Sequence, residues 1–325
     1  MQFVEQATGV AGTKRRRSVG LLLAALSVIL GGAALIPARA TRPEATVQIG
    51  MIESLFRGSD TAVMLAQTQP FSELLYSQTG VRGQFTIIPD AHEMAKQLRE
   101  EKLQLGIMHG IEYAWIKGEY PELQPLLLAY NQTIKLKGYL LVHRDSPLQT
   151  VGDLKGKTLA FPKRSLNHCY LFLHKAIGDA GHNPAGFFAP TACPANIDAA
   201  LDAVVDGTAD AVVVDGVSYE VFKSRKPGRA AKLRVLKESG LFPTATIVYK
   251  PSAANEEMVR KFRDGLTTAH ERVLGRQMLT LWRLSNFGHV PQEYSQLLND
   301  VLKEYPEPMH PAAFFPEPPK TGVGN

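Results

Sequence analysis

Short apolar runs alternate with amphipathic stretches along most of the chain. The run from Thr46 to Ile52 is almost continuously apolar, which predicts a strand buried on both faces of a sheet. Apolar residues at helical spacing follow Asp90, and Glu93 lies three residues after it, as in a capping box at a helix start. Repetition of this strand and helix pattern predicts an α/β fold, with parallel sheets covered by helices on both faces.

The same criteria predict the remaining elements. Further strands are expected at residues 84–89, 104–110, 125–130, 138–143, 158–161, 187–193, 209–215, 232–239 and 244–250. Helices are expected at 71–78, 90–102, 166–177 and 195–206, with short ones through Tyr113 and through Tyr219. The stretch from Glu256 to Leu302 is expected to be mostly helical, and a Pro-rich tail follows Tyr305.

The segment from Thr158 to Gly181 places polar chemistry at a helix start. Its strand breaks at Pro162 and gives way to a polar cluster that includes Arg164 and Ser165, and helical spacing begins at Leu166. Ser165 is the candidate N-cap. Because a helix start carries unpaired N–H groups and the positive end of a dipole, it favours an anion, and a guanidinium beside it would add to that preference. The alternative is a capped helix with a basic surface turn.

Residues 1–40 have the pattern of a secretory signal peptide. A basic head ending at Arg17 precedes an apolar stretch from Val19 to Ile36, and Ala38-Arg39-Ala40 follows. The pattern predicts export by the general secretory route, with cleavage near Ala40 and a periplasmic or secreted mature protein. A retained membrane anchor is the alternative.

Removal of this segment changes the charge of the protein. The chain has 36 Lys and Arg and 31 Asp and Glu, and residues 1–40 contain five of the former and one of the latter. The mature chain would therefore carry 31 basic and 30 acidic side chains, close to neutrality. No nucleic-acid footprint is predicted, and contact with a membrane is expected only through a partner protein.

The two cysteines and the lack of known catalytic motifs argue against an enzyme. Cys169 and Cys193 suggest a disulfide in an exported protein, with buried thiols or a metal or catalytic role as alternatives. The chain has no GxSxG or GxGxxG pattern, and Gly152 to Thr158 is one residue short of a phosphate-binding loop. His92-Glu93 lacks the second His of a zincin helix. No metal or other cofactor is predicted.

Four segments resemble one known family. They are residues 97–115, 138–161, 195–216 and 281–298, which contain IEYAW, DSP with DLKGK, DAALDAVVDG and LWRLSNFGHV. The chain resembles the substrate-binding proteins of phosphate, phosphite and phosphonate ABC importers. The resemblance implies a type II periplasmic-binding architecture of two α/β lobes, each a mostly parallel sheet flanked by helices, with two hinge crossings and the ligand in the cleft. It implies lobe 1 at 41–131 plus 244–325, lobe 2 at 138–240, and hinges near 132–137 and 241–246.

The resemblance and the topology together give the candidate ligand-binding residues. Tyr113 matches a ligand-facing aromatic of the family and Asp215 an acidic cleft position, with core packing and helix capping as their alternatives. At residues 164–168 the chain departs from the family's Ser/Thr-rich run, and Ile197 stands where many members have His. The full candidate set is Arg164, Ser165, Asn167, His168, Tyr113, His109, Asp215, Glu53 and Phe242.

The function expected from the resemblance is capture, not catalysis. An exported solute-binding protein would hold a small phosphonate-like or phosphate-like anion between its lobes and deliver it to an ABC permease. A ligand-presenting subunit for a membrane histidine kinase is the alternative partner arrangement. An enzyme of the thiamine-pyrimidine-forming type is a third hypothesis, against which the lack of a Cys cluster and the export signal both argue.

Overall fold

The computed structural model describes residues 46–56, 61–162, 165–189 and 193–308. Every element below belongs to one compact unit, Pro43–Asn325. The predicted signal peptide, its cleavage site near Ala40, and Arg164 lie outside the described residues. Within the described part of the chain, no helix is long and apolar enough to cross a membrane.

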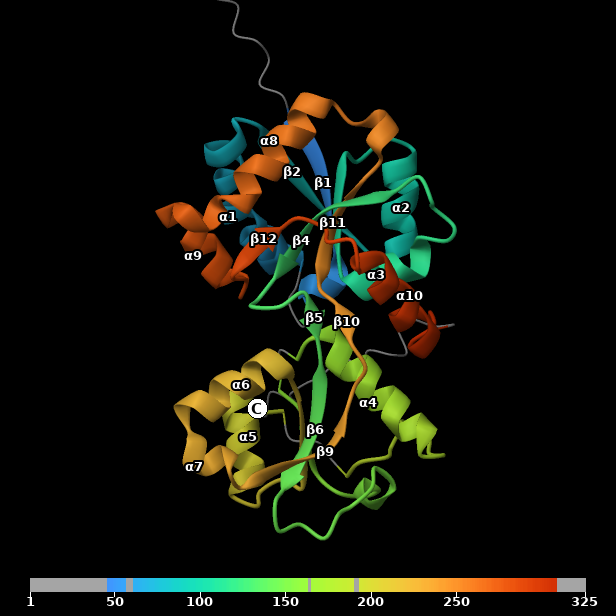
Figure 1. Ribbon diagram of the computed structural model, residues 1–325, viewed down its shortest axis with the longest axis vertical. Helices are drawn as coiled ribbons and strands as arrows, with labels where there is room; N and C mark the ends of the chain where they lie inside the picture. Colours follow the sequence, from blue (N-terminus) through green and yellow to red (C-terminus); the bar gives the residue numbers. More distant parts are fainter. Residues whose placement is uncertain (1–45, 57–60, 163–164, 190–192, 309–325) are drawn as a thin grey trace, which may run out of the picture. The chain divides into compact units, whose positions relative to one another are not determined.

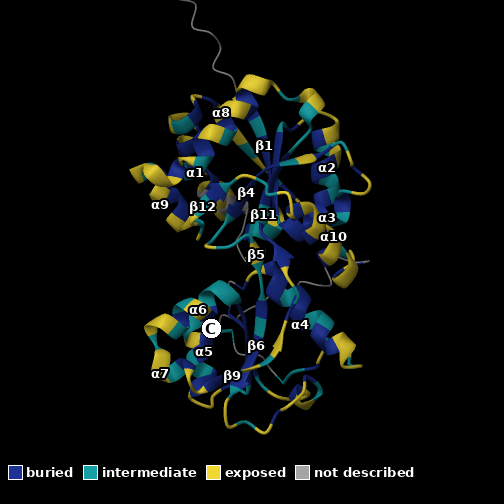
Figure 2. Ribbon diagram, in the orientation of Figure 1, coloured by how far each residue is buried: buried dark blue, intermediate teal, exposed yellow. Residues whose placement is uncertain are grey.

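Lobe 1 is built on a six-stranded sheet with helices on both faces (Figure 1). Its strand order is β12-β4-β11-β3-β1-β2, from Asn286–Gly288, Gln124–Tyr130, Ala245–Tyr249, Leu105–Met108, Thr46–Ile52 and Arg82–Ile88. Its helices are α1 (Thr61–Thr79), α2 (Ala91–Arg99), α3 (Gly110–Ile116), α8 (Glu256–Thr267), α9 (Val273–Leu281) and α10 (Tyr294–Glu304), with the short η1 (Glu53–Phe56), η3 (Pro251–Ala253) and η4 (Ala269–Glu271). The central strands β1 and β3 are largely buried, the edge strand β2 is partly exposed, and the outward faces of the helices are exposed (Figure 2).

The pattern of β1 explains how helices cover both faces of this sheet. Ile49 and Met51 pack into one hydrophobic cluster and Ile52 into another, as alternate strand residues must. Gly50 faces α2, where a Cβ would lie 2.5 Å from the sulfur of Met94. The absence of a side chain at Gly50 therefore lets α2 approach the sheet closely.

Lobe 2 is built on a four-stranded sheet in the order β7-β8-β6-β9. These strands are Leu159–Ala160, Ala211–Asp215, Gly138–His143 and Leu233–Glu238, and the helices are α4 (Asn167–Asp179), α5 (Ile197–Val205), α6 (Gly216–Arg225) and α7 (Pro227–Ala230), with the short η2 (Gly152–Leu154). Tyr219 and Phe222 of α6 pack on the same cluster as Leu201 and Val204 of α5. The two helices therefore cover one face of the sheet together.

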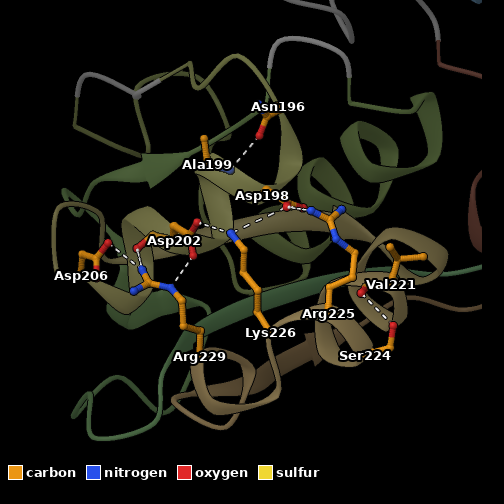
Figure 3. Close-up of polar contacts among 10 residues, drawn as sticks. All are labelled: Asn196, Asp198, Ala199, Asp202, Asp206, Val221, Ser224, Arg225, Lys226 and Arg229. Carbon is orange, nitrogen blue, oxygen red and sulfur yellow. Dashed lines mark hydrogen bonds and ion pairs between the residues drawn. The ribbon is translucent and has the colours of Figure 1, made fainter.

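A ladder of charges joins α5 to the end of α6 and to α7 (Figure 3). Arg229 Nε lies 2.5 Å from Asp202 Oδ1, and Lys226 Nζ lies 2.7 Å from Asp202 Oδ2. Asp198 and Asp206 extend the acidic row by one turn on either side, where they pair with Arg225 and Arg229. Burial alone would raise the pKa of Asp202, but the hydrogen bonds from Lys226 and Arg229 outweigh it and hold that pKa below its usual value.

Two short strands carry the chain between the lobes. β5 (Lys135–Leu136) follows β4, and β10 (Phe242–Pro243) precedes β11; the two pair antiparallel. After each crossing, the next strand enters the sheet of the other lobe and runs antiparallel to its neighbours. β6 is accordingly antiparallel to β8 and β9, and β11 is antiparallel to β3 and β4. The exact lobe and hinge limits remain predictions.

The α/β class and the two-lobed architecture are confirmed. Each sheet is mixed but mostly parallel: β1, β2, β3 and β4 run one way and β11 and β12 the other, and β7, β8 and β9 run one way and β6 the other. The stretch from Glu256 to Leu302 is mostly helical as expected, with one short interruption where β12 pairs with the edge of β4. One detail of the sequence analysis is wrong: no strand forms at 187–189, where Phe187 instead inserts into the core and its carbonyl accepts from Gly156 N at 2.8 Å.

The disulfide prediction is also contradicted. Cys169 and Cys193, both within the described residues, are thiols and are not bonded to each other. Cys169 is buried in the first turn of α4, with its sulfur 3.6 Å from His168 Nε2, whereas Cys193 is partly exposed. Among the described residues, no group of three His, Cys, Asp or Glu side chains could hold a metal ion.

Candidate functional site

A cavity of about 310 Å³ is lined by residues from both lobes and from the crossing strands. Lobe 2 contributes the start of α4 and the turn from β8 into α6, and the crossings contribute Leu136, Phe242 and Pro243. Lobe 1 contributes η1, the turn from β3 into α3, and the segment from α9 to β12. The polar lining residues are Ser54, His109, Asn131, Ser165, Asn167, His168, Asp215, Ser218, Thr244 and Arg283.

The start of α4 lines this cavity and contains unpaired polar groups. Its N-cap is Leu166, not the expected Ser165, and no side chain of the described residues caps the helix. Ser165 is buried and lines the cavity from the preceding turn. Asn167, the first residue of the helix, is only 3% exposed, and neither Nδ2 nor Oδ1 has a hydrogen-bond partner among the described residues. Leaving buried polar atoms unpaired is costly, so the Asn167 amide is the least satisfied polar group at this helix start.

His168 ties the same helix start to a crossing. Its Nε2 lies 3.2 Å from the carbonyl oxygen of Lys137, the residue after β5, and its ring lies 5.5 Å from that of Phe242 in β10. The Lys137 carbonyl also accepts from Gly216 N at 2.8 Å, at the start of α6. With Nε2 protonated, His168 donates to this oxygen, so one carbonyl joins the starts of two helices that face the cavity.

Asp215 is at once a helix cap and a lining residue. It ends β8, is buried, and accepts a hydrogen bond from Ser218 N at 2.9 Å as the N-cap of α6. It also lines the cavity, so both roles weighed from the sequence are compatible with its position. Asp215 is the carboxylate among the described lining residues, and it can accept from a protonated ligand group.

On the lobe 1 side, a buried carboxylate positions two lining residues. Glu112 accepts from Ser54 Oγ at 2.7 Å and from His109 N at 3.0 Å. His109 Nε2 lies 3.4 Å from the Ser54 carbonyl, which keeps the two lining residues together. Glu112 lies at the third position of α3, where a carboxylate commonly caps the helix start. That spacing from His109 was the signal that could have identified it.

Three candidates from the sequence are not placed at the cavity. Tyr113 is buried in lobe 1, where its hydroxyl donates to the Leu123 carbonyl at 3.0 Å and burial raises its pKa to about 12. Glu53 is exposed on η1, and neither residue is among the described residues that line the cavity. Arg164 lies outside the described residues. The structure does bring Ser165, Asn167, His168, His109, Asp215 and Phe242 together around one cavity.

The segment after α9 is the part of the lining that the sequence analysis missed. Trp282 packs edge-on against Phe56, with ring centroids 5.4 Å apart, and its buried Nε1 has no hydrogen-bond partner. Arg283 adopts a left-handed backbone conformation with φ of 54°, is exposed, and is also one of the lining residues. LWRLSNFGHV carried part of the family resemblance, but nothing in its pattern marked a cavity wall.

Two α/β lobes linked by a pair of crossing strands, with a cavity lined from both, define the class of type II periplasmic binding proteins. Residues 58–294 match the family described as the periplasmic phosphonate substrate-binding protein of ABC transporters. The chain belongs to this family, and the resemblance found in the sequence is confirmed. No curated protein sequence matches the chain.

Solved structures share the fold at low sequence identity. XAC2383 from Xanthomonas citri, bound to chloride ion, aligns with a TM-score of 0.55 at 17% identity, over 80% of this chain and 97% of that chain. A binding protein component of an ABC phosphonate transporter from Pseudomonas aeruginosa gives 0.52 at 16%, over 81% and 87%. PhnD1 from Prochlorococcus marinus, in complex with methylphosphonate, gives 0.51 at 14%, over 80% and 97%. At these identities the likeness shows the fold alone.

Proposed function

We propose that this protein is an exported solute-binding protein that captures a phosphonate-like or phosphate-like monoanion and delivers it to an ABC permease. The observation that carries the proposal is Asn167, whose two amide atoms are buried at the cavity without partners. Family membership supports capture in place of catalysis, and no bond is made or broken.

The donors at the start of α4 suit an oxyanion. The first N–H groups of a helix have no intrahelical partner, and here no side chain of the described residues caps them. Together with Asn167 Nδ2, they can donate to ligand oxygens at the positive end of the helix dipole. Arg164 stays a sequence-based candidate for the balancing charge, and Arg283 is a second cation on the described lining.

The acceptors at the cavity suit a ligand that also carries a proton. Asn167 Oδ1 needs a donor, and the Asp215 carboxylate can accept one as well. A singly protonated phosphonate offers both charged oxygens and a P–OH group, whereas a sulfonate near neutral pH offers acceptors only. The site should therefore prefer the phosphorus oxyanion to the isosteric sulfonate, because the sulfonate would leave an acceptor unpaired.

In this proposal, closure of the two lobes around the ligand precedes its delivery to a permease. Closure about the crossing strands would trap the anion and create the surface that a permease recognises. The predicted signal peptide places this exchange outside the cytoplasm. The cleavage site near Ala40 and the permease partner are both part of the proposal.

The test is calorimetric titration and thermal unfolding of the mature chain with methylphosphonate, phosphate, phosphite and methanesulfonate. A ligand present at 100 times its dissociation constant should add about 2.7 kcal/mol of stability. Asn167→Asp, which replaces a donor by a negative charge, should abolish binding. Asn299→Asp is the matched control, because Asn299 is exposed on α10 and contacts Lys117 away from the cavity. Failure of all the phosphorus anions to bind would refute the proposal.

A further inference from the structure

The cavity continues from its polar end into the apolar interior of lobe 1. The walls there are the side chains of Phe56, Phe71, Met278, Trp282, Leu284 and Phe287. Phe71 and Phe287 are stacked with centroids 6.0 Å apart, and Phe56 meets Trp282 edge-on. All six belong to or pack against the hydrophobic cluster between the sheet and α1, α8 and α9. We call this region the apolar chamber.

The cavity as a whole is larger than an oxyanion needs. Its volume of about 310 Å³, polar end and chamber together, lies at the lower end of the range for pockets that hold drug-sized ligands. The groups suited to an oxyanion, Asn167 and Asp215, come from lobe 2, whereas the aromatic walls come from lobe 1. An anion with a one-carbon substituent would leave those walls facing water or an empty space, and both forfeit the contacts that a packed side chain normally makes.

Trp282 gives the chamber an aromatic wall. It is the C-cap of α9, it lines the cavity, and its ring packs edge-on against Phe56 with centroids 5.4 Å apart. An apolar substituent in the chamber would cover this ring, which is the contact that a packed aromatic side chain normally makes.

We propose that the ligand is an organophosphonate with a large apolar substituent, alkyl or aryl, and that this substituent occupies the apolar chamber. This inference rests on the proposed function, which assigns the anionic group to the start of α4. The chamber sets specificity through the carbon skeleton, while Asn167 and Asp215 read the head group. Each buried methylene contributes about fourfold in affinity, from roughly 0.8 kcal/mol of transfer free energy.

The experiment titrates the mature chain with methyl-, ethyl-, propyl-, butyl- and phenylphosphonate. Affinity should rise about fourfold per carbon, so butylphosphonate should bind roughly 50-fold more tightly than methylphosphonate. The emission of Trp282, measured in a Trp115→Phe background, should shift progressively to shorter wavelength along the series as the substituent displaces water. The affinity and the emission wavelength should both depend on the size of the substituent, because the head group is the same throughout the series.

A pair of variants isolates the chamber. Leu284→Trp should fill it and bring the ratio of butylphosphonate to methylphosphonate affinity close to one. Val273→Trp is the matched control, since Val273 is exposed on α9 away from the cavity lining, and it should keep the wild-type ratio. Thermal unfolding of both variants without ligand checks that they fold, and the wild-type series tests the proposal whether or not Leu284→Trp folds.

The outcomes separate this inference from the proposed function. Equal affinity for every phosphonate in the series would refute the proposal that the substituent occupies the chamber, and would leave the proposal of phosphonate capture standing. An unchanged ratio in folded Leu284→Trp would do the same. Failure of every phosphonate to bind would overturn the proposed function, and the chamber with it.

Discussion

Two asparagines at the starts of α4 and α5, in the same lobe, show opposite use of the same side chain. Asn196 is the N-cap of α5, and its Oδ1 accepts from Ala199 N at 2.8 Å. Asn167 is the first residue inside α4, buried, with both amide atoms unpaired. The start of α5 is satisfied within the protein, whereas the start of α4 keeps two buried amide atoms without a partner among the described residues. The difference between the two helix starts, and not their shared polarity, is what supports the ligand site proposed at Asn167.

The largest effect that this contrast predicts comes from truncating the two asparagines. Asn167→Ala should weaken methylphosphonate binding roughly 10- to 100-fold, since a hydrogen bond to a charged group contributes about 1.5–3 kcal/mol. It should change the unfolding free energy of the ligand-free protein little, because no hydrogen bond is lost. Asn196→Ala should lower that stability by about 1 kcal/mol through loss of the cap. Titration and urea denaturation check the pair, and equal effects of the two variants on affinity would contradict the contrast.

Asp215 both caps α6 and lines the cavity, and one substitution can separate these two roles. Asp215→Asn keeps a good N-cap for α6, so stability should hold within about 0.5 kcal/mol. The acceptor for a protonated ligand is weakened, so we expect roughly tenfold weaker phosphonate binding, about 1.4 kcal/mol. Methanesulfonate binding should be unaffected or improved. The ratio of the two affinities is the measurement, and a parallel loss for both ligands would count against discrimination by Asp215.

The charge ladder of α5 extends the contrast to a cluster satisfied entirely within the protein. Asp202→Asn should cost about 1–2 kcal/mol at pH 7, because Lys226 and Arg229 lose a partly buried partner. Since the folded-state pKa of Asp202 is lowered, this stability is present above the unfolded pKa of about 3.9 and is lost as pH falls through the folded value. Denaturation at pH 7 and pH 3 should show the difference shrinking. A constant difference would rule out charge as its source.

The smallest effect is expected at Tyr113, the candidate that proved to lie in the core. Tyr113→Phe removes the hydrogen bond to the Leu123 carbonyl and should lower stability by about 1 kcal/mol. It should leave phosphonate affinity unchanged. Since burial raises its pKa to about 12, no titration of Tyr113 is expected below about pH 11. A change in affinity above threefold would return Tyr113 to the site.

The sequence predicted the fold well where the residues within a segment are enough to determine its secondary structure. β1 and α2 follow from an apolar run and a capping box, and Asp90 does accept from Glu93 N. Strand direction was not predictable for β6 and β11, since it depends on the crossings and not on their own apolar residues. The extended-looking segment at Phe187 became a packed loop because its contacts, not its pattern, decided the outcome.

Some residues of the candidate site could likewise be predicted from the sequence, and others could not. The start of α4, His109, Asp215 and Phe242 do line one cavity, because strand ends and helix starts meet there, and their role in binding stays a prediction. Sequence reasoning chose Tyr113 wrongly as a lining residue, since helix rotation points that ring into lobe 1. It missed Trp282 and the chamber because an apolar wall has the same pattern as core. Only the three-dimensional arrangement distinguishes a filled apolar space from an open one.

The Lys137 carbonyl has a consequence for how such a protein can diverge. It accepts from Gly216 N and lies within hydrogen-bond distance of His168 Nε2, so it links the two helix starts at the cavity. The acceptor is a main-chain atom, which every amino acid provides at that position. Mutation can therefore exchange the side chains at 164–167 and 215, and with them the ligand, while His168 and this carbonyl keep the two helix starts linked. Ligand preference can drift in this scaffold without a matching change at the junction that supports it.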